Sequence, residues 1–296
     1  MKKPTITITV LAGLLAAPGW AGLSIDETRS ADPDVNVSVE NLSGSVRVTG
    51  WDRPEIRVKG SLGEDTEGLT IDGDASDWEI EVEIPDGRWS GRRDVSSRLE
   101  IMVPRGADVE VETVSASIRV EDVDGRLDLE SVSGEIDASG GGGEVELETV
   151  SGGIEFSGND ANVEAESVSG RIELRGVAGE IEASSVSGGI DVEGSVARRA
   201  MIESISGEVR LTIDPTDDAV IHVEAHSSNV TLSLPDGVSA RFRVSTFSGR
   251  IDNDFGPDGE RTSRFAPGRS LDHSTRGGAA RVTVETFSGN VYLRGR

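Results

Sequence analysis

Carboxylate side chains recur in this sequence at intervals of about 18 residues, and such sets are candidates for binding a divalent cation. Calcium takes oxygen ligands, mostly from carboxylates and carbonyls. No stretch matches a calcium-binding loop motif, and like charges placed side by side repel each other. A solvated acidic face that keeps a repetitive sheet soluble explains the same residues, so calcium binding remains the alternative. The three sets are Asp128, Glu146, Glu164 and Glu182; Glu112, Glu130, Glu148 and Glu166; and Asp137, Glu155, Glu173 and Asp191.

Residues that could catalyse a reaction are repeated along the chain instead of gathering at one place. A serine followed by glycine recurs in equivalent copies of one repeated sequence segment, whereas a catalytic serine is a single residue with a base beside it. The three histidines are His222, His226 and His273, and the first two share one side of an expected strand without an evident third metal ligand. We predict no enzyme activity, no catalytic residue, no metal site and no cofactor.

Arginines are concentrated in the C-terminal part of the chain. Residues 241–296 hold 10 arginines and 6 acids, a balance of +4, whereas residues 106–195 hold 22 acids and 4 arginines, a balance of −18. Arginine suits bidentate contact with carboxylate or phosphate, so these side chains are candidates for contact with an anionic partner or with the acidic repeats of a second copy. A charge-balanced loop is the alternative. The candidates in or near this loop are Arg261, Arg264, Arg269, Arg276 and Arg281.

One short phrase recurs with a period of about 18 residues, which indicates a repeat architecture. Within each copy apolar and polar residues alternate with period two, as in Val145–Glu148, and this is typical of strands. Glycine and serine between the alternating stretches disfavour helix. We therefore predict an all-β chain folded as a single-stranded parallel β-solenoid (β-helix) with about 18 residues per coil. Copies begin at Thr113, Ser131, Thr149, Ser167 and Ser185, one residue late at Ser204, and in weaker form at Asn41, Thr246 and Thr286.

The alternation predicts a core of three columns, to which each repeat adds one apolar side chain per column. Leu147 and Val150 are separated by an odd number of residues, so we expect a bend at Thr149 or Val150 that turns both inward. Serines such as Ser151 are expected to cap this corner, and the glycine after each to take an unusual conformation or to admit another backbone. The predicted columns are Val114, Val132, Val150, Val168, Val186 and Ile205; Ile118, Ile136, Ile154, Ile172, Ile190 and Val209; and Val111, Leu129, Leu147, Ala165, Ala183 and Ile202.

Composition and the first residues indicate an exported protein. Lys2 and Lys3 precede an apolar stretch, residues 6–17, and small residues at Gly19 and Ala21 suit cleavage by a signal peptidase. The chain has no cysteine, which excludes disulfides and a lipid anchor on cysteine. It has no second apolar stretch after residues 6–17, so we expect no transmembrane segment after the signal peptide. The formal net charge of −25 argues against binding nucleic acid.

The expected organisation has four parts. A signal peptide covers residues 1–21, and residues 22–105 form an N-terminal β region with a polar insertion. Regular repeats cover 106–213, and irregular repeats with the arginine-rich loop 253–280 cover 214–296. The N-terminal region holds Trp51, Trp78 and Trp89, which we expect to cap the open end of the repeats, with an exposed sugar-stacking cluster as the alternative.

The repeat resembles the DUF4097 family of adhesin-like proteins built from β-strand repeats. The segments that carry the resemblance are "RLEIMVPRGADVEVETVSASIRVEDVDGRLDLESVSGEID", "LSLPDGVSARFRVSTFSGRI" and "AARVTVETFSGNVYLRG". It covers residues 35–296, with 74–97 and 253–280 as atypical insertions. The resemblance implies an exported β-solenoid associated with the cell envelope and supplies no catalytic residues.

These observations together favour a non-catalytic, adhesin-like binding or scaffold protein in the periplasm or at the cell surface. The expected partner is an envelope polymer or a protein, and self-association through acidic repeats and the arginine-rich part is a further possibility. Some parallel β-helices are polysaccharide lyases or hydrolases, so a glycan-active enzyme is the first alternative. A calcium-stabilised structural protein of the surface is the second.

Overall fold

The computed structural model describes residues 23–85, 94–158, 161–196, 198–263 and 267–296. The predicted signal peptide, Trp89 and Arg264 lie outside the described residues. The strands of the N-terminal part are β1 (Leu23–Ser30), β2 (Asn36–Trp51), β3 (Glu55–Leu62), β4 (Gly68–Asp74), β5 (Asp77–Glu83) and β6 (Ser97–Pro104). The strands of the middle part are β7 (Asp108–Val123), β8 (Leu127–Ser131), β9 (Ile136–Gly140), β10 (Glu144–Thr149), β11 (Ile154–Ser157), β12 (Asn162–Ser167), β13 (Ile172–Arg175), β14 (Ile181–Ser185), β15 (Ile190–Val196), β16 (Arg199–Ser204) and β17 (Val209–Pro215). The strands of the C-terminal part are β18 (Val220–Ala225), β19 (Val230–Leu234), β20 (Ala240–Ser248), β21 (Ile251–Asn253), β22 (Glu260–Arg261), β23 (Arg269–Ser274), β24 (Ala280–Ser288) and β25 (Val291–Gly295).

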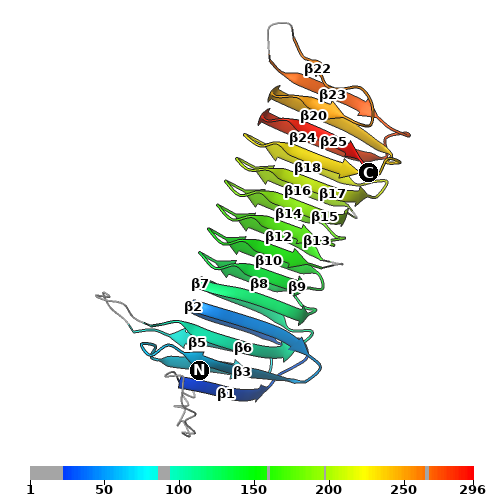
Figure 1. Cartoon of the computed structure of the whole chain (residues 1–296). Coiled ribbons are helices and arrows are strands. Elements are labelled where there is room, and N and C mark those ends of the chain that lie inside the picture. The colour runs from blue at the N-terminus through cyan, green and yellow to red at the C-terminus, as the bar shows by residue number, and fades with distance from the viewer. Residues whose placement is uncertain (1–22, 86–93, 159–160, 197, 264–266) are drawn as a thin grey trace, which may run out of the picture.

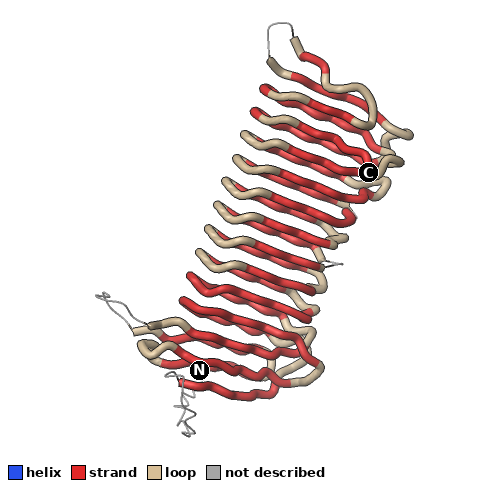
Figure 2. The backbone as a smooth tube through the Cα atoms, in the orientation of Figure 1, coloured by secondary structure: helices blue, strands red, loops and turns tan. Residues whose placement is uncertain are grey.

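The described chain is all-β, and the prediction of this fold class is confirmed. Its 25 strands join one long sheet that runs the length of an elongated molecule, as Figure 1 and Figure 2 show. No helix occurs among the described residues. The alternation read from the sequence accounts for the strands, because period-two apolar positions place every second side chain on one buried face.

The middle strands pair in parallel with the offset that the sequence repeat predicts. Val145 of β10 pairs with Val163 of β12, and Ile154 of β11 pairs with Ile172 of β13, so partners lie one sequence period apart. The offset is longer by one residue where β14 meets β16, in agreement with the late copy at Ser204. Each repeat therefore contributes two strands, and equivalent residues stack about 4.8 Å apart.

Both ends of the sheet depart from the order of the chain. Near the N-terminus, β2 lies between β5 and β6 on one side and β7 on the other. Near the C-terminus, the last strands β24 and β25 lie between β18 and β19 on one side and β20 and β21 on the other (Figure 1). Antiparallel strands close each end, where β1 pairs with β3 and β23 pairs with β20.

Two of the three predicted core columns are confirmed. The columns that contain Ile154 and Leu147 are buried in every regular repeat. The column that contains Val150 was predicted wrongly, because its six side chains are 41–54% exposed. Strand alternation continues unbroken from Glu144 through Glu146 and Glu148 to Val150, so all four point outward. Thr149 takes the inward position, and the corner begins only after Val150.

The corner is closed by a buried hydroxyl, and the serines predicted to cap it are exposed instead. The Gly152 N–H donates to Thr149 Oγ1 at 2.9 Å, and the Gly170 N–H donates to Ser167 Oγ at 2.8 Å. Ser151 and Ser169, which we expected to act as caps, lie on the surface. The prediction that the corner glycines admit another backbone is confirmed, since a Cβ on Gly152 would lie 1.7 Å from Gly134 O.

The tryptophans that the structure describes belong to the N-terminal end of the core. Trp78 is 8% exposed and packs within the core cluster, as expected of a cap. Trp51 is half-buried and its indole N–H donates to Glu55 O at 2.8 Å, while the Arg53 guanidinium lies over its ring. These contacts favour the structural role of both residues.

Candidate binding groove

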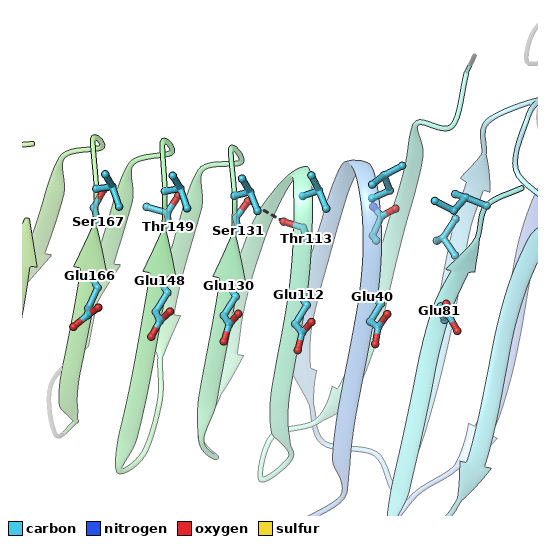
Figure 3. Close-up of a pocket in the computed structure, with 18 of the residues that line it drawn as sticks. Glu40, Glu81, Glu112, Thr113, Glu130, Ser131, Glu148, Thr149, Glu166 and Ser167 are labelled. Atoms are coloured by element: carbon cyan, nitrogen blue, oxygen red, sulfur yellow. Dashed lines mark hydrogen bonds between the residues drawn. The ribbon is translucent and has the colours of Figure 1, made fainter. Parts of the chain in front are cut away.

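A shallow groove of about 550 Å³ runs across seven consecutive strands of the sheet, from β5 and β2 through β7, β8, β10 and β12 to β14. It lies where the first strand of each repeat ends and the corner begins. Because equivalent residues of successive repeats stack in register, the groove is lined by columns of like side chains. Figure 3 shows one of these columns as a row of carboxylates that point the same way, beneath the buried hydroxyls of the corner.

Three columns define the groove and its outer border. The acidic column comprises Glu81, Glu40, Glu112, Glu130, Glu148 and Glu166. The apolar ridge comprises Val114, Val132, Val150, Val168, Val186 and Ile205. The serine column comprises the exposed residues that follow each ridge valine in the sequence, Ser115, Ser133, Ser151, Ser169 and Ser187.

Charges in the acidic column have no compensating partner among the described residues. None of its six carboxylates forms an ion pair with another described residue. The other face of the repeats differs, because Arg119 pairs with Asp137 and Arg175 pairs with Glu155 and Glu173. The three predicted sets of carboxylates stack in register. Arginine pairs with members of two of these sets, since Arg126 pairs with Asp128 and Glu146, and Arg175 pairs with Glu155.

Burial and like-charged neighbours raise the pKa values of groove carboxylates above their usual range. Partial burial is the main cause of the raised pKa of Glu148, and the carboxylates of Glu130 and Glu166 raise this pKa further. Glu130 and Glu40 have raised pKa values for the same two reasons. The folded protein therefore keeps like charges close together at neutral pH, at a cost in stability.

These pKa values predict that the protein is less stable at pH 8 than in mild acid. A carboxyl whose pKa is raised on folding binds its proton more tightly in the folded state, so stability falls as pH rises from about 4 through the raised pKa. Asp26 and Asp272 act oppositely, because Arg57 and Arg241 lower their pKa values and their stabilisation is lost as pH falls below about 4. We expect the highest Tm at about pH 5 in low salt.

Calorimetry at pH 5 and pH 8, each with and without added sodium chloride, measures this effect. Salt should raise the Tm at pH 8, because it screens the repulsion within the acidic column. Glu130→Gln should raise the Tm at pH 8 more than at pH 5. A Tm that climbs steadily from pH 5 to pH 8 in low salt would contradict the prediction.

The ridge continues toward the C-terminus with aromatic side chains in place of valine. Ile205 is followed in the stack by His226, Phe287 and Phe247, whose rings lie parallel with centroids 5.0 Å and 4.9 Å apart. Phe247 and Phe287 are 52% and 51% exposed. A second groove of about 500 Å³ lies along this stack, bordered by Glu224 and Glu285.

A buried amide lies at the N-terminal end of the first groove. Asn41 is 4% exposed, occupies the position that Thr113 and Ser131 hold in later repeats, and lines the groove. Neither its Nδ2 nor its Oδ1 has a hydrogen-bond partner among the described residues. A buried amide without partners costs stability, so the donor and the acceptor of Asn41 are both unsatisfied.

The predicted arginine candidates do not form one cluster. Arg281 lies on β24, in register with Arg241, and Arg276 lies in a turn with φ 46°. Arg261 pairs with Arg269 across β22 and β23, and Arg269 donates to Gly259 O at 3.1 Å and borders the second groove. Their role as partner contacts stays a prediction.

The histidines and acids gather into no metal centre within the described parts of the chain. No group of three or more His, Asp or Glu side chains there is placed to hold a metal ion. His226 stacks on Phe287, and His273 Nε2 lies 3.0 Å from Phe255 O, within hydrogen-bonding distance. The described residues also contain no helix long and apolar enough to span a membrane.

The apolar ridge was missed at the level of sequence although a signal for it is present. The valine of each repeat lies an even number of positions after the three outward-facing residues that precede it, as Val150 does after Glu148. The hydroxyl residue between them, Thr149, lies two positions after the buried Leu147 and is therefore on the inward side of the strand. Strict alternation would have placed the valine outside, and only the preference for burying an apolar side chain argued otherwise.

The C-terminal part of the chain matches the model of a known protein family. Residues 178–294 match the family Toastrack DUF4097. The resemblance to DUF4097 is therefore confirmed. The match includes four residues that line the second groove, Ile205, His226, Phe247 and Phe287.

Among the solved structures that resemble this chain are three bacterial proteins of low identity. A "putative adhesin" from Bacteroides fragilis is 9% identical over 92% of this chain and 97% of its own, with a TM-score of 0.44. A "putative adhesin" from Parabacteroides merdae is 11% identical over the same two shares, with a TM-score of 0.30. A "putative cell adhesion protein" from Clostridium sporogenes is 10% identical over 93% of this chain and 100% of its own, with a TM-score of 0.24. No curated protein matches the chain.

Proposed function

We propose that this protein is an exported, non-catalytic β-solenoid, with one coil per sequence repeat, that binds an elongated partner at the cell envelope in the manner of an adhesin. The observation that carries the proposal is the apolar ridge, whose six side chains are 41–54% exposed beside unpaired carboxylates. Contiguous exposed apolar side chains bordered by polar ones are typical of interaction surfaces. The partner would lie along the ridge and cross successive coils.

The regularity of the groove favours binding over catalysis. Acid–base catalysis needs a group with its own environment and protonation state at one place. Here the same carboxylate and valine return from coil to coil, so no acid of the groove differs by chemistry from the acids beside it. Such a surface suits a partner that is itself long and repetitive, in contact with several coils at once.

Export is supported by the residues before the first strand. A basic start, an apolar stretch and small residues near Ala21 form the pattern of a cleavable signal. The absence of cysteine from the chain leaves stability to core packing and to the parallel backbone hydrogen bonds.

Co-sedimentation of the full chain with purified cell-envelope fractions tests the proposed function. We expect binding that weakens tenfold or more, roughly 1.4 kcal/mol, when Val132, Val150 and Val168 are all replaced by threonine. Threonine keeps the shape and strand preference of valine and removes only its apolar character. The Tm should change little, because surface substitutions usually alter stability by about 0.5 kcal/mol or less.

The matched control replaces the same three valines by isoleucine, which keeps the ridge apolar. Equal binding of the threonine and isoleucine variants would contradict the proposal. The absence of any sedimentation of the unchanged protein, at low and at high salt, would contradict it equally.

A further inference from the structure

A partner that lies on the acidic column must bring positive charge to compensate it. Its six carboxylates have no ion pair with a described residue, and those of Glu130 and Glu148 repel each other across adjacent coils. A neutral or anionic chain laid over them would desolvate these charges without compensating them. Lysine or arginine side chains would relieve the repulsion and form charge-assisted hydrogen bonds.

The free amide of Asn41 adds a second, independent requirement. Its Nδ2 and Oδ1 atoms are buried, without partners, and lie at one end of the groove beside Glu40 and Leu42. A side-chain amide offers donors and an acceptor together, which matches the C=O and N–H of a peptide group. The end of the groove is therefore suited to hold the backbone of a polypeptide.

The spacing of the coils selects among extended backbone conformations. Side chains on one face of a β-strand lie about 6.6 Å apart, which does not fit a ladder with a step of about 4.8 Å. A polyproline II helix has three residues per turn and rises about 3.1 Å per residue, so every third side chain recurs after about 9.3 Å. Two coils span about 9.6 Å, so a cationic residue at every third position meets every second carboxylate.

We propose that the groove binds a cationic polypeptide in the polyproline II conformation, with a basic residue at every third position facing the acidic column and apolar residues lying on the ridge. This inference rests on the proposed function, since it names the chemistry of the partner that the same groove would hold. The groove crosses seven strands, a length of about 29 Å, which accommodates about nine residues of such a helix. Asn41 would hold a backbone amide at one end.

Fluorescence anisotropy with synthetic peptides and the full chain tests the inference. The probe is a labelled peptide of about nine residues made of three Lys-Pro-Val triplets. The matched peptide has the same composition arranged in blocks of lysine, proline and valine. We expect the triplet peptide to bind at least about tenfold more tightly than the block peptide, and its affinity to fall as salt is added.

Protein variants separate the groove from general attraction to an acidic protein. Replacing Glu112, Glu130 and Glu148 by glutamine should weaken the triplet peptide about tenfold or more. The matched control removes an equal number of negative charges from the other face through Asp137→Asn, Glu155→Gln and Asp191→Asn. Its affinity for the triplet peptide should stay within about twofold of that of the unchanged protein. Equal losses in the two variants would overturn the inference.

The variant Asn41→Leu separates a ligand contact from a structural role, because we expect its peptide affinity to fall while its stability stays the same or rises. Leucine removes a buried amide without partners, so the variant should be as stable as the unchanged protein or more stable. Peptide affinity should nevertheless fall about tenfold. Unchanged affinity in this variant would remove Asn41 from the site and overturn the inference as stated.

The outcome for the peptide and the outcome for the envelope fractions are separable. Tight binding of a labelled chitin oligomer, with no binding of the triplet peptide, would overturn the inference of a polypeptide partner. The proposed function would still stand in that case if the threonine variant lost its binding to the envelope fractions. Retained envelope binding in the threonine variant would overturn the proposed function whatever the peptides do. Binding of the block peptide as tightly as the triplet peptide would overturn the polyproline II register.

Discussion

Gly152→Ala is expected to destabilise the protein by about 4 kcal/mol or more, because a methyl group at this corner has no room. The added Cβ would lie 1.7 Å from Gly134 O, a backbone atom of the preceding repeat. The two backbones must separate to relieve this overlap, which would break the parallel hydrogen bonds around the corner. We expect the Tm to fall by about 10 °C.

The neighbouring glycine offers a matched control within the same corner. A Cβ on Gly153 would meet only Arg171 O, at 3.7 Å, which is an ordinary contact. Gly153→Ala should therefore change the unfolding free energy by about 0.5 kcal/mol or less. Urea denaturation followed by circular dichroism compares the two variants, and equal stability for both would contradict the close approach at Gly152.

Ile154→Ala is expected to lower the unfolding free energy by about 2–5 kcal/mol, the range for removal of a large buried aliphatic side chain. Ile154 is 2% exposed and stacks between Ile136 and Ile172 of adjacent repeats. A cavity at this position cannot close without shifting both neighbours, since the column is continuous through the core.

Val150→Ala in the same repeat is the control, because the sequence suggested the same buried environment for it. Val150 is 45% exposed on the ridge, so its loss should cost about 0.5 kcal/mol or less. Chemical denaturation of both variants distinguishes the buried column from the exposed one. A similar loss in the two variants would show that the ridge packs against something in the folded monomer.

Much of the architecture follows from the sequence because both of its periods have a direct physical meaning. Period-two alternation requires strands with one buried face, and the longer repeat requires equivalent residues to stack in parallel register. The columns of Ile154 and Leu147 and the three sets of stacked carboxylates follow from these two facts alone. A late copy at Ser204 even predicts the change of offset between β14 and β16.

The corner was decided by tertiary structure. Apolar Val150 and polar Thr149 compete for one inward position, and hydrophobicity alone favours valine. The fold places Thr149 inside because the N–H of Gly152 needs an acceptor where water does not reach, and the threonine hydroxyl supplies one. The valine is left on the surface, and the repetition of this choice in every regular repeat creates the ridge.

The ends of the sheet and the special properties of the groove also depend on tertiary structure. Repeated strands carry nearly the same pairing pattern, so local sequence does not specify that β24 inserts between β18 and β20. The lack of an ion-pair partner for Glu148 among the described residues, and the free amide of Asn41, depend on which residues of distant segments lie opposite them. The sequence by itself determined the repeating unit and its buried columns, whereas contacts between repeats determined which side chains were left exposed.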